Sequence, residues 1–218
     1  MTVRYTLILG TKNWSSWSLR PYLAMRAVGA PFEEIVLKLR RSESSDEIRQ
    51  YSPSAKVPAL KITENGRVFT VWDSLAICET LAERHPEGGL WPADPEARAL
   101  ARSYAAEVHS GFAAMREKLT MEFARRLPTP EFGEAVENDI ARVIQAWSKA
   151  LSAGREGGFL FGRFSIADCL YAPVVSRFIT YGIEVPGLLD AYCARMMELP
   201  AMQDWMKAAK AEVDAGLV

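Results

Sequence analysis

The first forty residues alternate between short apolar runs and one stretch of helical spacing. Residues 5–9 form an apolar run that ends at Gly10, which predicts a buried strand. Along residues 17–28 the apolar positions recur at helical spacing, and Gly29 is a typical helix end. Residues 32–37 predict a second strand. A strand, a helix and a strand in this order predict a right-handed βαβ unit with parallel strands.

The next segment predicts a short helix, two antiparallel strands and another helix. Residues 40–50 are charged and contain serines that suit a helix cap, and residues 57–62 read as a strand. Asn65-Gly66 separates that strand from a further apolar run, which is a strong hairpin signal. Asp73-Ser74 then opens an amphipathic helix. The complete order, βαβαββα, predicts a thioredoxin-like α/β domain.

The remainder of the chain is helical. Prolines and glycines crowd residues 86–96, which predicts a linker between a first domain at 1–85 and a second at 97–218. Apolar residues follow helical spacing throughout the second domain and predict an all-α helix bundle. We expect the first stripe to form a single long helix; it comprises Leu100, Tyr104, Val108, Phe112, Met115 and Leu119.

Composition excludes several classes of protein. The chain has 26 Lys and Arg against 27 Asp and Glu, without the basic excess of a nucleic-acid-binding protein. No secretory signal and no run of about 20 apolar residues is present, so we expect a cytoplasmic protein that does not enter membranes. Cys78, Cys169 and Cys193 form no C-x-x-C pair, and neither His85 nor His109 has metal-ligand spacing. We therefore expect reduced thiols and no bound metal.

Two dipeptides in the first domain suggest a peptide-binding site. Pro58 has no N–H to donate to a sheet, so it suits the first residue of a strand. If the Val57–Pro58 bond is cis, the backbone of Val57 turns outward and can pair with an extended peptide. Asp73 and Ser74 suit a helix cap, and they also suit an amino-acid head group. In that second interpretation, the carboxylate of Asp73 faces an ammonium group and the helix start faces a carboxylate.

The segment between the first strand and the first helix contains a group of serines. Because proline is tolerated in the first turn of a helix, Pro21 predicts a helix start at about residues 17–20. Ser15, Ser16 and Ser18 then lie at or just before that start, where they can act as caps. Alternatively, one hydroxyl donates to the thiolate of a ligand, which the positive end of the helix also stabilises.

These motifs together resemble the glutathione S-transferase family over nearly the whole chain. Residues 15–20 are similar to the Ser-Ser-Cys signature of the zeta class, although Trp17 replaces the cysteine and Pro21 is foreign to that signature. Residues 56–60 resemble the family's cis-proline segment, and residues 73–77 resemble its γ-glutamyl-binding step. No cysteine lies in the turn that follows the first strand, which argues against the classes that form a mixed disulfide with glutathione.

The resemblance implies a role for each motif. Ser15, or alternatively Ser16, would activate the thiol of glutathione. The residues implied to bind glutathione are Trp17, Lys56, Val57, Pro58, Asp73 and Ser74, although Lys56 also reads as a solvated surface lysine. A cleft for the second substrate would include Tyr104, His109 and Phe112, which core packing explains equally well. A homodimer without metal is also implied.

Three functions agree with this resemblance. The first is a glutathione transferase that adds the thiol to a small, apolar electrophile. The second is a zeta-like, glutathione-dependent isomerase of the maleylacetoacetate type, and the third is a non-catalytic interaction or stress module of the same fold. Retention on glutathione resin followed by turnover of a chromogenic aryl halide separates the enzyme from the module.

Ser165 and Asp168 stand three residues apart before an apolar helix. This spacing predicts a capping box, in which each residue's side chain bonds the other's backbone N–H. The resemblance implies a buried capping box at the same place. We therefore expect Asp168 to stabilise the helical domain and not to act as a catalytic acid.

Overall fold

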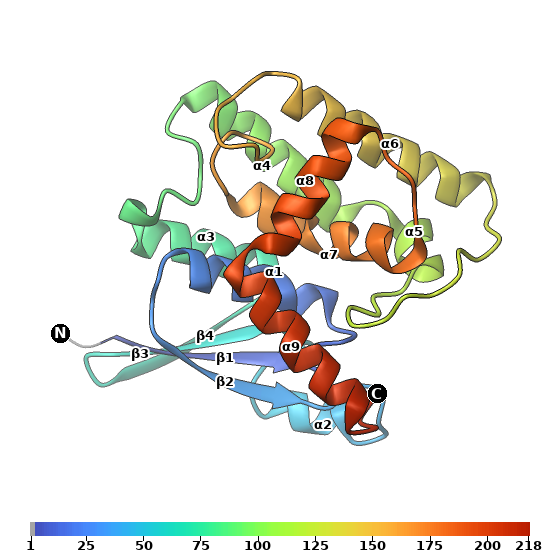
Figure 1. The fold of residues 1–218 in the computed structure, drawn as a ribbon. Coiled ribbons are helices and arrows are strands. Elements are labelled where there is room, and N and C mark those ends of the chain that lie inside the picture. Colours follow the sequence, from blue (N-terminus) through green and yellow to red (C-terminus); the bar gives the residue numbers. More distant parts are fainter. Residues whose placement is uncertain (1–2) are drawn as a thin grey trace.

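The computed structural model describes residues 3–218 as a sheet-containing domain followed by a helical domain (Figure 1). The first domain comprises β1 (Arg4–Gly10), α1 (Ser16–Ala27), β2 (Phe32–Leu37), α2 (Ser44–Arg49), β3 (Ala59–Glu64), β4 (Arg67–Trp72) and α3 (Ser74–Arg84). Its four strands lie in the order β2-β1-β3-β4. β1 is parallel to β2 and antiparallel to β3, and β3 is antiparallel to β4. The thioredoxin-like order predicted from the sequence is confirmed.

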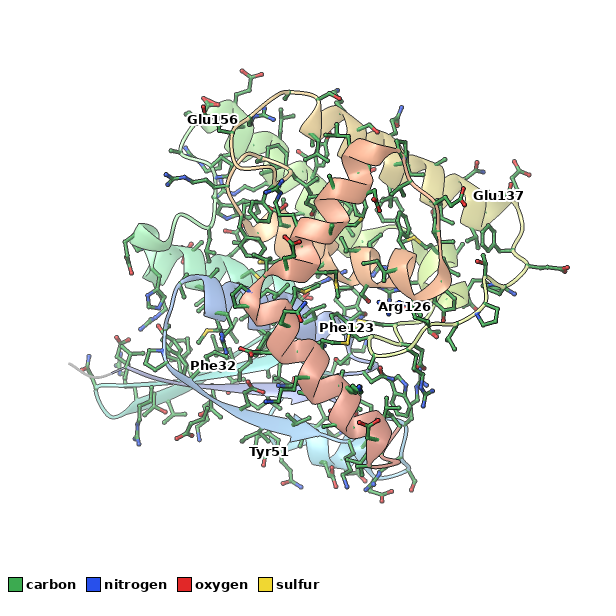
Figure 2. All side chains as sticks on the ribbon, viewed as in Figure 1. Phe32, Tyr51, Phe123, Arg126, Glu137 and Glu156 are labelled. Atoms are coloured by element: carbon green, nitrogen blue, oxygen red, sulfur yellow. The ribbon has the colours of Figure 1, made fainter. Side chains whose placement is uncertain are left out.

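The helical domain begins after a short connection. The connection contains the short 3-10 helix η1 (Pro86–Gly88). The domain itself comprises α4 (Pro95–Ser110), α5 (Ala113–Lys118), α6 (Glu134–Leu151), α7 (Ile166–Tyr181), α8 (Gly187–Glu198) and α9 (Pro200–Asp214). Proline at the start of α4 suits the first turn, where no N–H is needed. Charged side chains such as Glu137 and Glu156 point outward from this domain (Figure 2).

Helices cover both faces of the sheet. α1 and α3 lie on the face toward the helical domain, and α2 lies on the opposite face (Figure 1). Alternate residues of β1 serve the two faces: Leu7 and Leu9 join the main core, whereas Ile8 packs with Ile48 of α2. The main core continues from the sheet through α1 into α7, so apolar packing joins the two domains.

The last helix returns to the first domain. α9 leaves the helical domain and runs down beside the sheet (Figure 1), and its C-terminal end lies beside β2 and the turn that follows β1. Trp205 of α9 is fully buried and packs against Tyr22 of α1, with 4.9 Å between ring centroids. Residues from opposite ends of the chain therefore lie side by side.

Two local predictions are confirmed in detail. Asn65 and Gly66 both have positive φ, at 52° and 75°, as a tight hairpin turn between β3 and β4 requires. Ser165 and Asp168 form the capping box at the start of α7. The Asp168 carboxylate accepts bonds from the N–H and hydroxyl of Ser165, from the N–H of Leu160 and from the hydroxyl of Tyr192.

Two predictions about helix boundaries are wrong. α1 begins at Ser16, so Pro21 lies in its second turn and has no N–H to donate to the carbonyl of Trp17. The helix starts early because the preceding backbone already turns, with Ser15 N–H bonded to the carbonyl of Thr11. The stripe from residue 100 to 119 is not one helix, because Phe112 has a left-handed backbone (φ 58°) that ends α4 and begins α5.

Within residues 3–218, no helix has the length and apolar content required to cross a lipid bilayer. The same residues contain no group of three or more histidine, cysteine, aspartate or glutamate side chains arranged to hold a metal ion. Cys78, Cys169 and Cys193 are all buried as free thiols.

Candidate functional site

A cavity of about 280 Å³ opens where α1, β3 and α3 begin. Its lining combines one acid, one cation, two hydroxyls and two indoles. The lining residues are Trp17, Ser54, Lys56, Val57, Pro58, Trp72, Asp73 and Ser74. Six of the eight residues predicted to contact the ligand or its thiol therefore lie together, although they come from three separate parts of the chain.

Asp73 stands at the junction of β4 and α3 with an uncommon backbone conformation. Its φ is 76°, which non-glycine residues seldom adopt, and it is the N-cap of α3. One carboxylate oxygen, Oδ1, accepts from the N–H groups of Leu75 and Ala76 at 2.9 and 3.2 Å. The other oxygen, Oδ2, lies 3.3 Å from Nε2 of His109 on α4. One carboxylate thus caps the helix and also faces the cavity and the helical domain.

The peptide bond between Val57 and Pro58 is cis, as the sequence interpretation required. Pro58 is buried just before β3, and Val57 is half-buried on the cavity wall. Lys56 is exposed at the rim, and Trp72 at the end of β4 is 47% exposed. An exposed indole and a lysine at one rim suit a ligand with both flat and anionic parts.

Ser15 and Ser16, the residues predicted to activate the thiol, are buried and do not line the cavity. Ser15 is the N-cap residue of α1 and is 4% exposed, and its hydroxyl donates to Oγ of Ser18 at 2.7 Å. Ser18 in turn accepts from the N–H of Gly10 at 3.0 Å. Ser16 is also buried, and only Trp17 of this segment lines the cavity. The thiol-activating role of Ser15 or Ser16 therefore stays a prediction.

Two arginines lie against the ring of Trp17. The guanidinium carbons of Arg20 and Arg116 are 4.2 and 5.1 Å from the ring centroid. Burial, followed by the charges of Arg116 and Arg177, lowers the pKa of Arg20 to about 9. Arg20 Nη1 lies 3.5 Å from the hydroxyl of Ser74, and its buried Nε has no hydrogen-bond partner among the described residues. Positive charge is thus concentrated directly behind the cavity.

Comparison with known proteins agrees with this arrangement. Residues 14–84 match the model of the glutathione S-transferase N-terminal domain, and residues 121–208 match that of the C-terminal domain. A probable maleylacetoacetate isomerase of Caenorhabditis elegans is 33% identical over 161 residues, which cover 73% of this chain and 72% of the relative. The chain belongs to the glutathione S-transferase family.

Other members of the glutathione S-transferase family match over most of their length. A maleylpyruvate isomerase of Ralstonia is 28% identical over 208 residues, covering 90% of this chain and 94% of the relative. The crystal structure of a maleylacetoacetate isomerase from Anaeromyxobacter dehalogenans, with glutathione bound in its active site, superimposes with a TM-score of 0.69. The two sequences are 26% identical, and the superposition covers 94% of this chain and 95% of the isomerase chain.

His109 connects the two domains of this glutathione S-transferase family member. Its Nε2 faces Asp73, its ring lies edge-on to Trp17 at 5.2 Å, and its Nδ1 is buried without a partner among the described residues. Burial lowers the pKa of His109, the Asp73 carboxylate opposes that change, and Arg20 and Arg116 add to it. The imidazole contacts Asp73, and a role of His109 toward a second substrate stays a prediction.

The other two residues predicted for a second-substrate cleft lie outside the cavity beside Asp73. Phe112 is buried in the main core. Tyr104 is half-buried and packs edge-on against Phe161, with ring centroids 5.3 Å apart. Neither lines the cavity beside Asp73. Their role in a second-substrate cleft stays a prediction, beside the alternative of core packing.

Sequence reasoning missed four residues of the site: Ser54, Trp72, Arg20 and Arg116. For Trp72 a signal existed, because it directly precedes the Asp73-Ser74 step and ends a strand. The sequence gives no such signal for Arg116, because it lies 99 positions from Trp17 and meets it only in the folded protein.

Proposed function

We propose that the cavity beside Asp73 binds glutathione. The tripeptide carries one ammonium group, two carboxylates and an extended peptide backbone. The cavity offers groups that can bind the three charged groups and a backbone segment that can hydrogen-bond with the peptide. Asp73 faces the ammonium group, while Ser74 at the start of α3 receives the adjacent carboxylate. The backbone of Val57 pairs with the peptide, and Lys56 attracts the second carboxylate.

The start of α1 supplies the electrostatic part of the reaction. Bound glutathione contributes a thiol, whose thiolate adds to an electrophilic carbon and, in an isomerisation, leaves again after bond rotation. The positive end of α1 favours the thiolate, and a hydroxyl of Ser15 or Ser16 donates to it. Because the Ser15 proton points to Ser18, this step requires its hydroxyl to rotate toward the ligand.

We infer that the reaction is a glutathione-dependent isomerisation of a small, conjugated dicarboxylate. The relatives, which are isomerases of maleylacetoacetate or maleylpyruvate, support this alternative over addition to an apolar electrophile. The single observation in this chain that carries it is the pair of guanidinium groups of Arg20 and Arg116 beside Trp17, because cations suit a charged substrate better than an apolar one.

Turnover assays test this proposal directly. With glutathione present, we expect isomerisation of maleylpyruvate or maleylacetoacetate at a kcat/KM at least about tenfold above that for a chromogenic aryl halide. Replacement by alanine of the serine that donates to the thiolate, Ser15 or alternatively Ser16, is expected to lower kcat about 10²-fold, because one hydrogen-bond donor is removed. Ser103→Ala, exposed on α4, is the control. Faster turnover of the aryl halide would restore the transferase interpretation. Glutathione binding without turnover of either substrate would favour a non-catalytic module.

We also propose that the protein is a homodimer. β4 is an edge strand of the sheet, with exposed apolar side chains at Val68 and Phe69 and with Trp72 at its end. A second copy over this strand would remove that apolar surface from water and would lie beside the cavity. Sedimentation at the mass of two chains supports the dimer, and sedimentation at the mass of one chain excludes it.

A further inference from the structure

The turn between β1 and α1 is bonded to the last helix of the chain. The two oxygens of the Glu212 carboxylate, on α9, accept from the consecutive N–H groups of Lys12 and Asn13, each at 2.9 Å. Consecutive amides that point to one side form an anion-binding concavity. The protein therefore fills an anion site in its own turn with a side chain that lies 200 residues further along the chain.

A second residue of α9 bonds the same turn. The indole N–H of Trp205 donates to the carbonyl of Lys12 at 2.9 Å, and this bond is buried. The Lys12 ammonium group lies about 5 Å from the ring centroids of both Tyr22 and Trp205 and pairs with Glu34. The backbone of Lys12 is thus bonded to α9 through both its N–H and its carbonyl.

The segment between α5 and α6, where Figure 2 labels Phe123, bonds the opposite side of the turn. Asn13 is completely buried, and its side-chain amide donates to the Glu122 carboxylate at 2.7 Å. The Asn13 carbonyl accepts from Phe123 N–H, and its side-chain oxygen accepts from Ala124 N–H. Glu122 also accepts from the indole of Trp14 at 2.9 Å. Every polar group of Asn13 is therefore bonded to the helical domain.

Backbone hydrogen bonds within the turn connect it to the first residues of α1. The N–H groups of Trp14 and Ser15 both donate to the carbonyl of Thr11, at 3.1 and 2.8 Å. Ser15 is the N-cap of α1, and Trp17 lines the cavity. Because Thr11 directly precedes Lys12, we expect a displacement of Lys12 and Asn13 to move the first turn of α1. Val57 and Asp73 lie in other parts of the chain, just before β3 and α3.

We propose that Glu212 is a positioning residue for the glutathione thiol, an inference that rests on the proposed function. Its carboxylate fixes the backbone of Lys12 and Asn13 and thereby the serines and Trp17 at the start of α1. The helical domain contributes to the chemistry of the thiol through its last helix, without touching the ligand. Loss of this contact changes the rate of reaction far more than the affinity for glutathione.

The test uses the full chain with Glu212→Gln, which keeps the side-chain volume but replaces one acceptor by a donor. The expected result is a fall in kcat of about 10- to 100-fold, since small displacements of reacting groups have costs of this size. The Kd for glutathione is expected to change less than about threefold, because Val57 and Asp73 are unaffected. Asp214→Asn, exposed on the same helix, is the control for the loss of one negative charge.

Amide hydrogen exchange gives a readout that needs no turnover. In Glu212→Gln, exchange is expected to accelerate at residues 12–16 and to stay unchanged in β3 and α3. Addition of acetate to Glu212→Ala, which leaves the two amides open, is expected to slow exchange at the turn again.

Unchanged kcat and unchanged exchange in Glu212→Gln would overturn the proposal. So would faster exchange throughout the chain, which indicates a general loss of stability. If the wild-type chain fails to bind glutathione, the proposed function is wrong, and the exchange experiment still tests the contact itself.

Discussion

Asp168→Ala is expected to lower the free energy of unfolding by at least about 3 kcal/mol while the glutathione site keeps its affinity. The carboxylate is completely buried and accepts four hydrogen bonds, from Leu160, Tyr192 and two groups of Ser165. Each buried donor left without a partner costs about 1–3 kcal/mol. Burial raises the pKa of Asp168 to about 6, so the group is ionised at pH 7 and accepts all four bonds.

Chemical denaturation followed by circular dichroism measures this loss of stability. Asp190→Ala is the control, because Asp190 is exposed in the first turn of α8 and carries the same charge. Surface substitutions of this kind usually change stability by less than about 0.5 kcal/mol. Near-normal stability of Asp168→Ala combined with lost turnover would contradict the capping role and make Asp168 a catalytic candidate.

Asp73→Asn is expected to raise the Kd for glutathione about 10- to 100-fold without unfolding the protein. Hydrogen bonds to a charged group contribute about 1.5–3 kcal/mol, and the substitution removes the negative charge that faces the ammonium group. Asparagine keeps one oxygen, which continues to accept from Leu75 and Ala76 and to cap α3. The effect should therefore appear in isothermal titration with glutathione and only weakly in thermal denaturation.

Asp94→Asn supplies the matched control. Asp94 is the N-cap of α4 and accepts from Ala97 at 2.9 Å, so its substitution makes the same chemical change at another helix start. Equal glutathione affinity in the two variants and in the wild type would mean that the Asp73 carboxylate does not contact the ligand. A large fall in melting temperature in Asp73→Asn alone would mean that its contact with His109 is mainly structural.

Local patterns were sufficient for most of the fold. The βαβ unit, the Asn65-Gly66 hairpin and the Asp73 cap each depend on residues within a few positions of one another, and each is confirmed. The cavity could be anticipated because Val57, Asp73 and Trp17 all stand at the start of an element, and such starts gather at one edge of this fold. Short-range chemistry therefore predicted both the elements and much of the site.

The predictions of helix boundaries failed where contacts in the folded protein, and not the local sequence pattern, determine where a helix begins or ends. Apolar spacing continues through Phe112, yet the chain turns there and buries the ring in the core, so spacing alone could not show the break. Pro21 was expected in a first turn, but backbone bonds from Thr11 start α1 earlier. Neither Arg116 beside Trp17 nor Glu212 beside Lys12 has a sequence signal, because each contact joins residues that are far apart in the chain.

Titration of isotope-labelled protein with glutathione, followed by amide chemical shifts, tests directly whether the tripeptide occupies the cavity formed where three elements of the first domain begin. Saturable shifts are expected at Val57, at Ser74 and at the indole of Trp17. The larger cavity of about 520 Å³ near Trp91 and Phe161 serves as an internal comparison, and we expect no chemical-shift changes at the residues that line it. Shifts confined to that larger cavity, or no saturable shifts at all, would contradict the account.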